Sequence, residues 1–367
     1  MKVVLSGGGT GGHIYPALTI GEEICHLHPG TELLYIGTAS GLEAELVPKA
    51  GIPFATVASR GLNRKNLFAS MQAAATALGG VWQSIGLLRQ FRPQVVVGTG
   101  GYVCGPVLLA AFLLGIPTLI QEQNAIAGIT NRLLSHVVDG VALGYAEASS
   151  RFSGRCRQAV TGNPVRREVL TAQREESLKQ LGLSSSCKTL LVAGGSRGAR
   201  SINQAMIEVH AALAMREDVQ VLHITGKNEY NNVVDELRRR GLEEAPRLFV
   251  RPYLHEMPAA LAAADLAVFR AGALGIAELT VRGVPAILVP YPYASENHQE
   301  WNARVLANAG AAKVLGDAQL EEGLLQETVL TLLDDSQQLT AMAEASRALG
   351  RPQAARDIAE WAVKLVK

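Results

Sequence analysis

Two glycine-rich loops, each preceded by a short apolar run typical of a strand, constrain what this chain can fold into. The first loop, residues 7–12, follows a predicted strand at 3–6, and the second, residues 194–198, follows one at 189–193. A strand that runs through a glycine turn into a helix is the repeating unit of parallel α/β sheets. Two such units half a chain apart predict two similar α/β domains that face each other across a cleft.

The rest of the chain supports two doubly wound domains with parallel sheets. Its 367 residues suit two domains at a prior of roughly 150 residues each, and 48% hydrophobic residues suffice for two cores. Short apolar runs alternate with longer helical patterns, as in βαβ units. The predicted strands are 3–6, 33–37, 54–57, 95–98, 118–121 and 141–143 in the first half, and 189–193, 219–225, 248–250, 266–269 and 286–289 in the second.

The join between the domains is expected at Thr161-Gly162-Asn163-Pro164, where glycine and proline interrupt the pattern before a charged helix over 165–181. This gives a first domain of residues 1–161 and a second of residues 162–340. We expect the C-terminal helical segment, 341–367, to pack back on the first domain.

Charge and cysteine content narrow the class of protein. Thirty-four basic residues against 33 acidic ones give a net charge of +1, which predicts no nucleic-acid partner. The four cysteines are scattered without metal-ligand spacing, and the N-terminus has no pattern of a secretory signal, so a reducing cytosol is the simplest compartment. No DxD pair occurs near a strand end, and we expect neither a metal nor a cofactor.

The first loop contains GxGxxG, the spacing of a dinucleotide site. That fingerprint also needs an acidic residue at the end of the second strand, to bind a ribose hydroxyl. The second predicted strand ends in Ile36-Gly37-Thr38, and Glu32 lies at its start. An NAD-dependent oxidoreductase is therefore disfavoured. We interpret the loop as a surface of backbone donors for an anionic or polar group, with a tight turn as the structural alternative.

His13 follows this loop at the expected N-terminus of the first helix. The helix dipole and the free amides there disfavour the imidazolium and keep a neutral imidazole available as a general base. The structural alternative is a capping or hydrogen-bonding histidine. The position beside the glycine loop favours the base.

The second domain carries features suited to a nucleotide. The loop 194–199 leads into a helix whose amides can receive phosphate, with Ser196 as a side-chain donor, but it lacks the P-loop pattern. The segment 270–278 repeats this arrangement and adds Glu278, a carboxylate suited to a ribose diol or, alternatively, to the helix dipole. Gln299 and Asn302, three apart on one helix, can bond sugar hydroxyls.

Two further strand ends carry polar or glycine-rich turns, at 98–102 and 121–124. Together they can line a pocket for a hydroxyl-rich ligand. Each of them alone is explained equally well as an ordinary turn.

Residues 66–90 contain no charge before Arg89 but are too polar and too rich in glycine for a membrane span. The residues alone favour a helix that faces the core. The functional alternative is a patch of Arg60, Arg64, Lys65, Phe68 and Trp82 that rests on an anionic membrane surface.

Seven motifs, taken together and in this order, resemble the MurG family of bacterial peptidoglycan N-acetylglucosaminyltransferases over nearly the whole chain. They are Gly-Gly-Thr-Gly-Gly-His at 8–13, Gly-Thr-Gly-Gly-Tyr at 98–102, Gln-Glu-Gln-Asn at 121–124, Thr-Gly-Asn-Pro-Val-Arg at 161–166, Gly-Gly-Ser-Arg-Gly-Ala at 194–199, Arg-Ala-Gly-Ala-Leu at 270–274 and His-Gln-Glu-Trp-Asn at 298–302.

The resemblance implies a GT-B fold and an inverting, metal-independent transfer of GlcNAc from UDP-GlcNAc to the C4 hydroxyl of MurNAc in lipid I, which forms lipid II. It also implies peripheral work at the cytoplasmic face of the bacterial inner membrane, favours the membrane patch, and suggests cell-wall synthesis proteins as partners. The implied base is His13. The other implied contacts are Thr10, Gly11, Gly12 and Asn124 near the donor sugar and the acceptor, and Arg166, Ser196, Leu254, Ala273, Leu274, Gly275, Glu278 and Gln299 around UDP-GlcNAc.

Two positions depart from the family pattern. Gly275 stands where a threonine or serine is frequent, and His298 where a glutamine is frequent. The alternatives that stay open are another GT-B lipid glycosyltransferase, a UDP-GlcNAc 2-epimerase, and a nucleotide-sugar binding protein without turnover.

Overall fold

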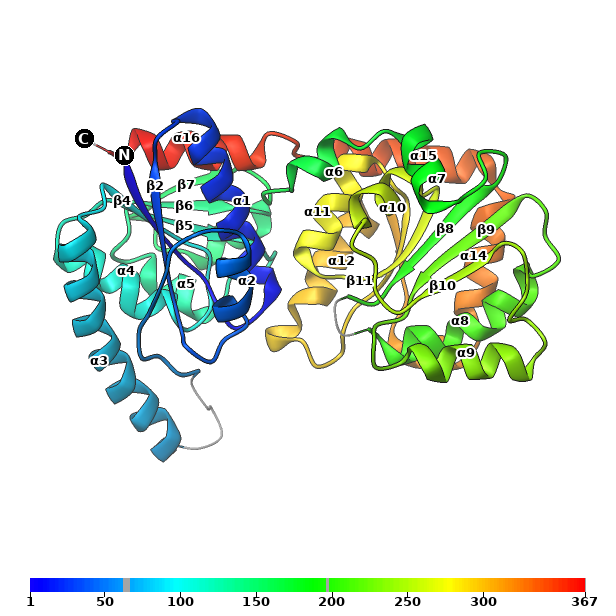
Figure 1. Ribbon diagram of the computed structural model, residues 1–367, viewed down its shortest axis with the longest axis horizontal. Helices are drawn as coiled ribbons and strands as arrows, with labels where there is room; N and C mark the ends of the chain where they lie inside the picture. The colour runs from blue at the N-terminus through cyan, green and yellow to red at the C-terminus, as the bar shows by residue number, and fades with distance from the viewer. Residues whose placement is uncertain (62–66, 196–197, 367) are drawn as a thin grey trace. The chain divides into compact units, whose positions relative to one another are not determined.

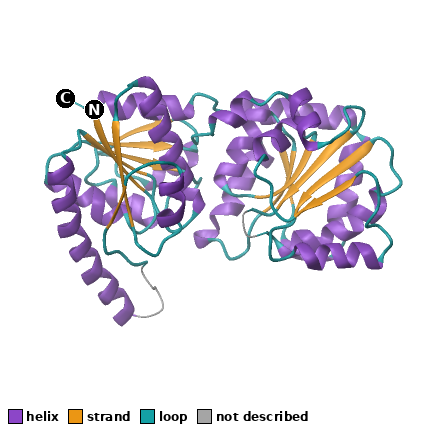
Figure 2. Cartoon of the chain, viewed as in Figure 1, coloured by secondary structure: helices purple, strands orange, loops and turns teal. Residues whose placement is uncertain are grey.

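A computed structural model describes residues 1–61, 67–195 and 198–366 and divides the chain into two compact units. Unit 1 comprises Met1–Val165 and Arg351–Lys367, and unit 2 comprises Arg166–Gly350. In each unit, helices cover both faces of a twisted sheet (Figures 1 and 2). Every strand pairing is parallel, which confirms the doubly wound architecture.

Unit 1 contains a seven-stranded sheet in the order β3-β2-β1-β4-β5-β6-β7. Its strands are β1 (Lys2–Ser6), β2 (Glu32–Gly37), β3 (Phe54–Thr56), β4 (Val95–Gly98), β5 (Thr118–Glu122), β6 (Gly140–Leu143) and β7 (Arg157–Val160). Its helices are α1 (Gly11–Leu27), α2 (Glu43–Lys49), α3 (Leu67–Phe91), α4 (Cys104–Leu113), α5 (Ile129–Leu134), the 3-10 helix η1 (Ala146–Arg151) and α16 (Ala354–Lys364).

Unit 2 contains a six-stranded sheet in the order β10-β9-β8-β11-β12-β13. Its strands are β8 (Lys188–Ala193), β9 (Val219–Ile224), β10 (Leu248–Arg251), β11 (Leu266–Arg270), β12 (Ala286–Val289) and β13 (Ala312–Val314). Its helices are α6 (Arg167–Thr171), α7 (Arg174–Leu181), α8 (Arg200–Leu213), α9 (Tyr230–Arg239), α10 (Met257–Ala263), α11 (Ala273–Arg282), η2 (Ser295–Asn297), α12 (His298–Asn308), α13 (Asp317–Glu321), α14 (Leu324–Asp334) and α15 (Ser336–Leu349).

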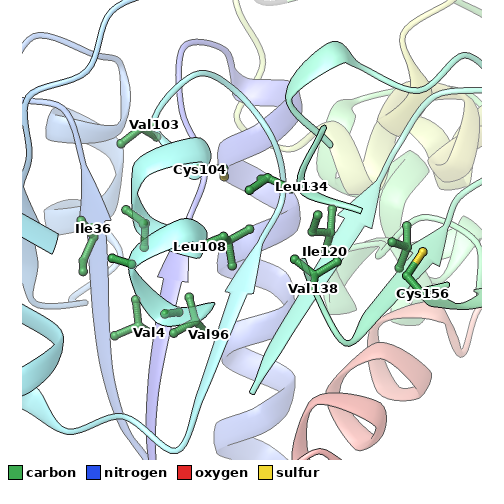
Figure 3. Packing of buried hydrophobic residues seen from close by; sticks show 14 of the residues in the cluster. Val4, Ile36, Val96, Val103, Cys104, Leu108, Ile120, Leu134, Val138 and Cys156 are labelled. Carbon is green, nitrogen blue, oxygen red and sulfur yellow. The ribbon is translucent and has the colours of Figure 1, made fainter. Parts of the chain in front are cut away.

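The central strands are apolar on both faces because helices cover both sides of each sheet. In β1, Val4 belongs to one core cluster and its neighbours Val3 and Leu5 belong to another, as the alternation of side chains along a strand requires. Figure 3 shows the first cluster, in which residues of the strands gather with Leu108 of α4. Leu108 is fully buried, so its truncation to alanine should cost about 2–5 kcal/mol of stability.

Each predicted strand overlaps an observed one, but the prediction missed two strands at sheet edges. β7 and β13 each pair with one neighbour only, and most of β7 is exposed. An edge strand buries less side-chain area, so its sequence need not be a continuous apolar run. The helix predicted over 165–181 is two helices, α6 and α7, because Ala172 and Gln173 between them are not helical, with ψ 130° and 135°.

The boundary between the units lies between Val165 and Arg166, whereas the sequence placed it after residue 161. The structure also divides the C-terminal segment 341–367 at Gly350. Before that residue, α15 packs on α11 in unit 2, and after it α16 packs on α1 in unit 1, where Ile358 is fully buried.

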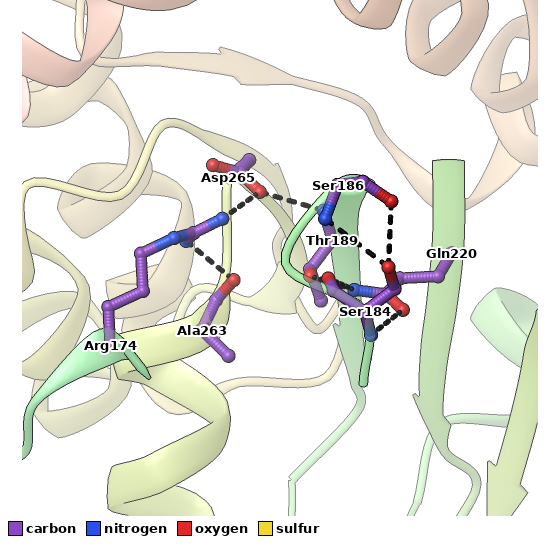
Figure 4. A network of polar contacts seen from close by, with 7 residues as sticks. All are labelled: Arg174, Ser184, Ser186, Thr189, Gln220, Ala263 and Asp265. Atoms are coloured by element: carbon purple, nitrogen blue, oxygen red, sulfur yellow. Dashed lines mark hydrogen bonds and ion pairs between the residues drawn. The ribbon is translucent and has the colours of Figure 1, made fainter. Parts of the chain in front are cut away.

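A polar network fixes the ends of β8 and β11 that lie opposite the glycine loops (Figure 4). Arg174 of α7 donates to Asp265 at 2.7 Å and to the carbonyl of Ala263 at 2.7 Å. The same Asp265 oxygen accepts from the backbone amide of Thr189 at 2.7 Å. Gln220 of β9 extends the network to the Thr189 hydroxyl at 2.9 Å. These groups tie α7 to the sheet.

Candidate functional site

In both sheets the strand order reverses next to a glycine loop. The reversal falls between β1 and β4 in unit 1 and between β8 and β11 in unit 2. Ligands of open parallel sheets bind beyond the carboxyl ends of the strands at such switch points, where connections diverge to opposite faces. The loops 7–12 and 98–102 meet this condition in unit 1, and 194–199 and 270–275 meet it in unit 2.

The two loops of unit 1 touch each other through glycine backbone. The amide of Gly8 donates to the carbonyl of Gly100 at 3.3 Å. Gly101 has a φ of +83°, and a Cβ at this position would lie 2.2 Å from the carbonyl oxygen of Gly8. The approach therefore needs glycine at 101, for its conformation and for its lack of a side chain.

His13 lies in the first turn of α1 and points its Nδ1 atom at two hydrogen-bond acceptors. Nδ1 is 3.0 Å from the carbonyl oxygen of Thr99 and 3.0 Å from Oε1 of Gln123. Because a carbonyl oxygen can only accept, we assign the proton of the neutral ring to Nδ1. Nε2 then carries the lone pair. This geometry gives His13 the form that a general base requires.

Glu43 is a buried group that the sequence prediction missed. It is fully buried, and it accepts from the backbone amide of Gly9 at 3.1 Å and from the amide and hydroxyl of Thr38 at 3.1 and 2.7 Å. It thus joins the first glycine loop to the end of β2. Because this carboxylate already takes the Gly9 amide, the first loop suits a neutral polar group better than a phosphate.

A second buried carboxylate, Glu122, shapes the loop that carries Asn124. Glu122 is 1% exposed and accepts from the backbone amides of Asn124 and Gly128 at 3.0 Å each, and from the side-chain amide of Asn131 at 2.8 Å. Asn124 is half-buried. The predicted contacts in the first loop differ in exposure: Thr10 and Gly12 are exposed and Gly11 is half-buried.

In unit 2, two of the predicted contact residues bond to each other. Arg166 donates from Nε at 3.0 Å and from Nη2 at 2.8 Å to the same oxygen, Oε1, of Glu278. Burial raises the pKa of Glu278, and Arg166 opposes that rise. Among the hydrogen bonds of the described residues none is donated to Oε2 of Glu278, so this oxygen remains available to a ligand hydroxyl.

Two helices of unit 2 present open N-termini beyond adjacent strands. α8 follows β8 and α11 follows β11, and among the residues that the structure describes neither has a capping side chain or an acidic residue in its first turn. Their free amides and dipoles suit an anionic group. At the start of α11, Ala273 is buried and Leu274 and Gly275 are half-buried.

The loop before α8 is held close to β9. Gly198 has a φ of +77°, and a Cβ there would lie 2.2 Å from the carbonyl oxygen of Thr225. Glycine is therefore required at this point of the loop. Ser196, the predicted side-chain donor in this loop, lies outside the described residues.

The remaining predicted contact residues of unit 2 are Gln299, Asn302 and Leu254. Gln299 is half-buried, and its Oε1 accepts from the backbone amide of Tyr291 at 2.9 Å. Asn302 is fully buried and donates to the carbonyl of Ala271 at 3.3 Å, which ties α12 to the loop before α11. In this structure its side chain supports that loop and is not presented to solvent. Leu254 is half-buried in the segment after β10.

The predicted membrane patch is described in part. Arg60 is exposed, and on α3 the side chains of Leu78 and Trp82 are 65% and 74% exposed. Arg64 and Lys65 lie outside the described residues, and Phe68 lies in the first turn of α3. None of the described helices combines the length and the apolarity that a membrane crossing needs. Within the described residues there is also no group of three or more acidic, histidine or cysteine side chains placed to hold a metal ion.

Comparisons with known proteins assign the family. The model of the glycosyltransferase family 28 N-terminal domain matches residues 3–143, and that of the C-terminal domain matches residues 189–360. Two similar relatives carry the name UDP-N-acetylglucosamine–N-acetylmuramyl-(pentapeptide) pyrophosphoryl-undecaprenol N-acetylglucosamine transferase. The one from Desulforudis audaxviator is 49% identical and covers 100% of this chain and 98% of its own. The one from Bacillus subtilis is 45% identical and covers 97% of each chain.

Solved structures agree with this assignment. The crystal structure of Acinetobacter baumannii MurG matches with a TM-score of 0.78 and 30% identity, over 99% of each chain. A UDP-GlcNAc 2-epimerase from Neisseria meningitidis shares the fold at 16% identity, with a TM-score of 0.66, over 99% of this chain and 100% of its own. With both halves matched by family models and relatives nearly half identical along its whole length, the chain belongs to glycosyltransferase family 28 and, within it, to the MurG family of N-acetylglucosamine transferases.

Proposed function

We propose that this chain transfers GlcNAc from UDP-GlcNAc to the C4 hydroxyl of MurNAc in undecaprenyl-pyrophosphoryl-MurNAc-pentapeptide, lipid I, and so forms lipid II. Its membership of the MurG family supports the overall reaction. The observation that carries the chemistry is the orientation of His13, whose Nδ1 faces two acceptors and whose Nε2 keeps a lone pair.

His13 acts on the acceptor. Its Nε2 takes the proton of the MurNAc C4 hydroxyl as that oxygen attacks the anomeric carbon of GlcNAc. The new carbon–oxygen bond forms on the face opposite the bond to UDP, which breaks and leaves its electron pair on the phosphate oxygen. The configuration at the anomeric carbon therefore inverts. A correctly placed general base contributes about 10²- to 10⁴-fold to such a rate.

Unit 2 binds the donor. The diphosphate of UDP meets the open N-termini of α8 and α11, whose amides stabilise the charge that grows as UDP departs. Oε2 of Glu278 accepts a hydrogen bond from a ribose hydroxyl, while Arg166 holds the other carboxylate oxygen. Gln299 directs its amide group to the donor: among the hydrogen bonds of the described residues, only its Oε1 is engaged, by the backbone amide of Tyr291.

Because the proposed acceptor is linked to a lipid, the protein must act at a membrane surface. We place peripheral contact at the exposed part of α3, with Leu78 and Trp82 entering the interface and Arg60 near anionic headgroups. This corresponds to the cytoplasmic face of the bacterial inner membrane, where proteins of cell-wall synthesis are candidate partners.

Transfer of radiolabelled GlcNAc from UDP-GlcNAc to a lipid I analogue, with EDTA present, tests this function. The wild type should form the lipid-linked disaccharide and His13→Ala should not. The matched control is His26→Ala, which changes an exposed histidine on the same helix. UDP-GlcNAc binding without lipid-linked product would favour a different acceptor or a binding role, and conversion of UDP-GlcNAc without acceptor would favour an epimerase.

A further inference from the structure

We propose that three buried side-chain amides, those of Asn163, Gln121 and Gln123, form a relay that acts together with the Thr99 carbonyl to hold the proton of His13 on Nδ1 and so keeps Nε2 free as the base. The proposal rests on the proposed role of His13. It adds positioning residues for the same reaction, and all of them lie in unit 1.

The relay starts at a backbone carbonyl, which fixes its direction. Nδ2 of Asn163 donates to the carbonyl oxygen of Gln123 at 3.0 Å, so Oδ1 of Asn163 must be its acceptor end. Oδ1 accepts from Nε2 of Gln121 at 2.9 Å, and Oε1 of Gln121 in turn accepts from Nε2 of Gln123. The remaining oxygen of Gln123, Oε1, therefore faces Nδ1 of His13 at 3.0 Å.

Each amide prevents its neighbour from flipping. The side chains of Gln121, Gln123 and Asn163 are 0%, 2% and 4% exposed, so no bulk water can replace a lost partner. Turning Gln121 over would set its NH₂ group against that of Gln123 and its Oε1 against Oδ1 of Asn163. Either contact would leave buried polar groups without a hydrogen-bond partner, which disfavours the flipped arrangement.

The backbone supplies further acceptors at the far end of the relay. The carbonyl oxygens of Thr99, at 2.7 Å, and Gln121, at 3.0 Å, share the two N–H groups of Gln123 Nε2 with Oε1 of Gln121. A reversed Gln123 would direct its NH₂ group at Nδ1 of His13 and favour the tautomer with the lone pair on Nδ1. That tautomer carries its proton on Nε2 and cannot accept one from the substrate there.

Gly144 offers a way to disturb the relay without removing any polar group. A Cβ at this position would lie 2.4 Å from Oδ1 and 2.8 Å from Nδ2 of Asn163, so Gly144→Ala must displace that side chain. The matched control is Gly154→Ala in the same unit, where a Cβ would meet nothing within 4 Å.

The test is ¹⁵N NMR of the full chain labelled on histidine, with the His13 signals assigned by their loss in His13→Ala. The wild type at neutral pH should show a protonated Nδ1 and an unprotonated Nε2. Asn163→Ala and Gly144→Ala should populate the other tautomer. The Gly154→Ala spectrum should match that of the wild type.

Steady-state kinetics complete the test. The relay variants should lower kcat about 10- to 100-fold, the scale of a misplaced catalytic group, with the KM for UDP-GlcNAc changed less than about twofold. Relay variants that keep the wild-type tautomer would overturn the proposal. If the tautomer shifts but His13→Ala retains full turnover, the relay holds and the role of His13 as base fails.

Discussion

Arg166 and Glu278 form an ion pair in which both guanidinium donors, Nε at 3.0 Å and Nη2 at 2.8 Å, meet one carboxylate oxygen. The two residues are 112 positions apart in the chain. Burial raises the pKa of Glu278 and Arg166 opposes that rise, and the pairing leaves the second oxygen for a ligand. We propose that this second oxygen accepts a hydrogen bond from a ribose hydroxyl of the donor.

We expect Glu278→Gln to weaken UDP-GlcNAc binding while leaving kcat at saturating donor within a few-fold. Hydrogen bonds to a charged group contribute about 1.5–3 kcal/mol, so the Kd should rise by about 10- to 100-fold. Isothermal titration calorimetry measures the change. The control is Glu243→Gln, which breaks an ion pair with Arg238 on the surface of unit 2. An unchanged Kd would place the ribose elsewhere.

We expect His13→Ala to lower kcat about 10²- to 10⁴-fold, the range for a general base, with the Kd for UDP-GlcNAc changed little. The reason is that the donor contacts proposed above all belong to unit 2, whereas His13 belongs to unit 1. Single-turnover transfer to a lipid I analogue and donor titration separate the two quantities. Turnover near that of the wild type would remove His13 from the mechanism.

We expect Gly101→Ala to lower the stability of unit 1 through a steric clash. Alanine there would suffer the unfavourable φ of +83° and would also meet the Gly8 carbonyl at 2.2 Å. Gly115→Ala shares the positive φ, +66°, but its Cβ would meet nothing within 4 Å. Gly115→Ala should therefore lower the stability by about 1–3 kcal/mol, and Gly101→Ala should lower it by more. Thermal unfolding measures both changes. Equal losses would mean that the contact does not matter.

We expect the stability of unit 2 to fall as the pH drops from about 7 to 5, because of a buried histidine pair. Nε2 of His210 is 3.0 Å from Nδ1 of His223, and Nδ1 of His210 has no hydrogen-bond partner. Burial lowers the pKa of His210 to about 4 and lowers that of His223 well below its usual value, so both are neutral when folded.

The sign of this effect follows from proton binding. Below pH 6.5 the two histidines bind protons in the unfolded chain but stay neutral in the folded one. The stabilisation from the neutral pair is therefore fully present above that pH and is lost as the pH falls towards 4. His210 alone should contribute about 2 kcal/mol between pH 7.5 and 5. Hydrogen exchange of β9 across this range measures it. His210→Leu should flatten the dependence, and a slope equal to that of the wild type would contradict the assignment.

We expect Trp82→Ser to weaken binding to vesicles that contain anionic phospholipid by about tenfold, since burying a large apolar side chain contributes about 1.5–3 kcal/mol. Co-sedimentation measures the partition. The control is Met215→Ser, because Met215 is also exposed, at 90%, but lies in unit 2. UDP-GlcNAc binding should be the same in both variants. Unchanged sedimentation of Trp82→Ser would move the membrane contact away from α3.

Much of the fold was predictable from local pattern. The core strands are apolar runs because they are buried on both faces, and the glycine loops stand where parallel strands turn into helices. Two edge strands, β7 and β13, escaped the prediction because Arg157, Gln158 and Lys313 leave them without a continuous apolar run, whereas the edge strands β3 and β10 were predicted. The break between α6 and α7 escaped as well, because it depends on two residues, Ala172 and Gln173, whose side chains give no distinctive signal.

The candidate site was likewise predictable from the sequence only in part. The sequence alone determined which residue types stand at the strand ends, including His13 and Glu278, because those positions follow from the order of strands and turns. The tertiary structure decided their partners: Glu43 for Gly9, Arg166 for Glu278, and the relay from Asn163 to His13. Parallel sheets join strands through long crossovers, so side chains far apart in sequence meet at one edge. A hydrogen bond between such side chains produces no periodic pattern in the sequence. Only the packed sheet brings the donor and the acceptor together.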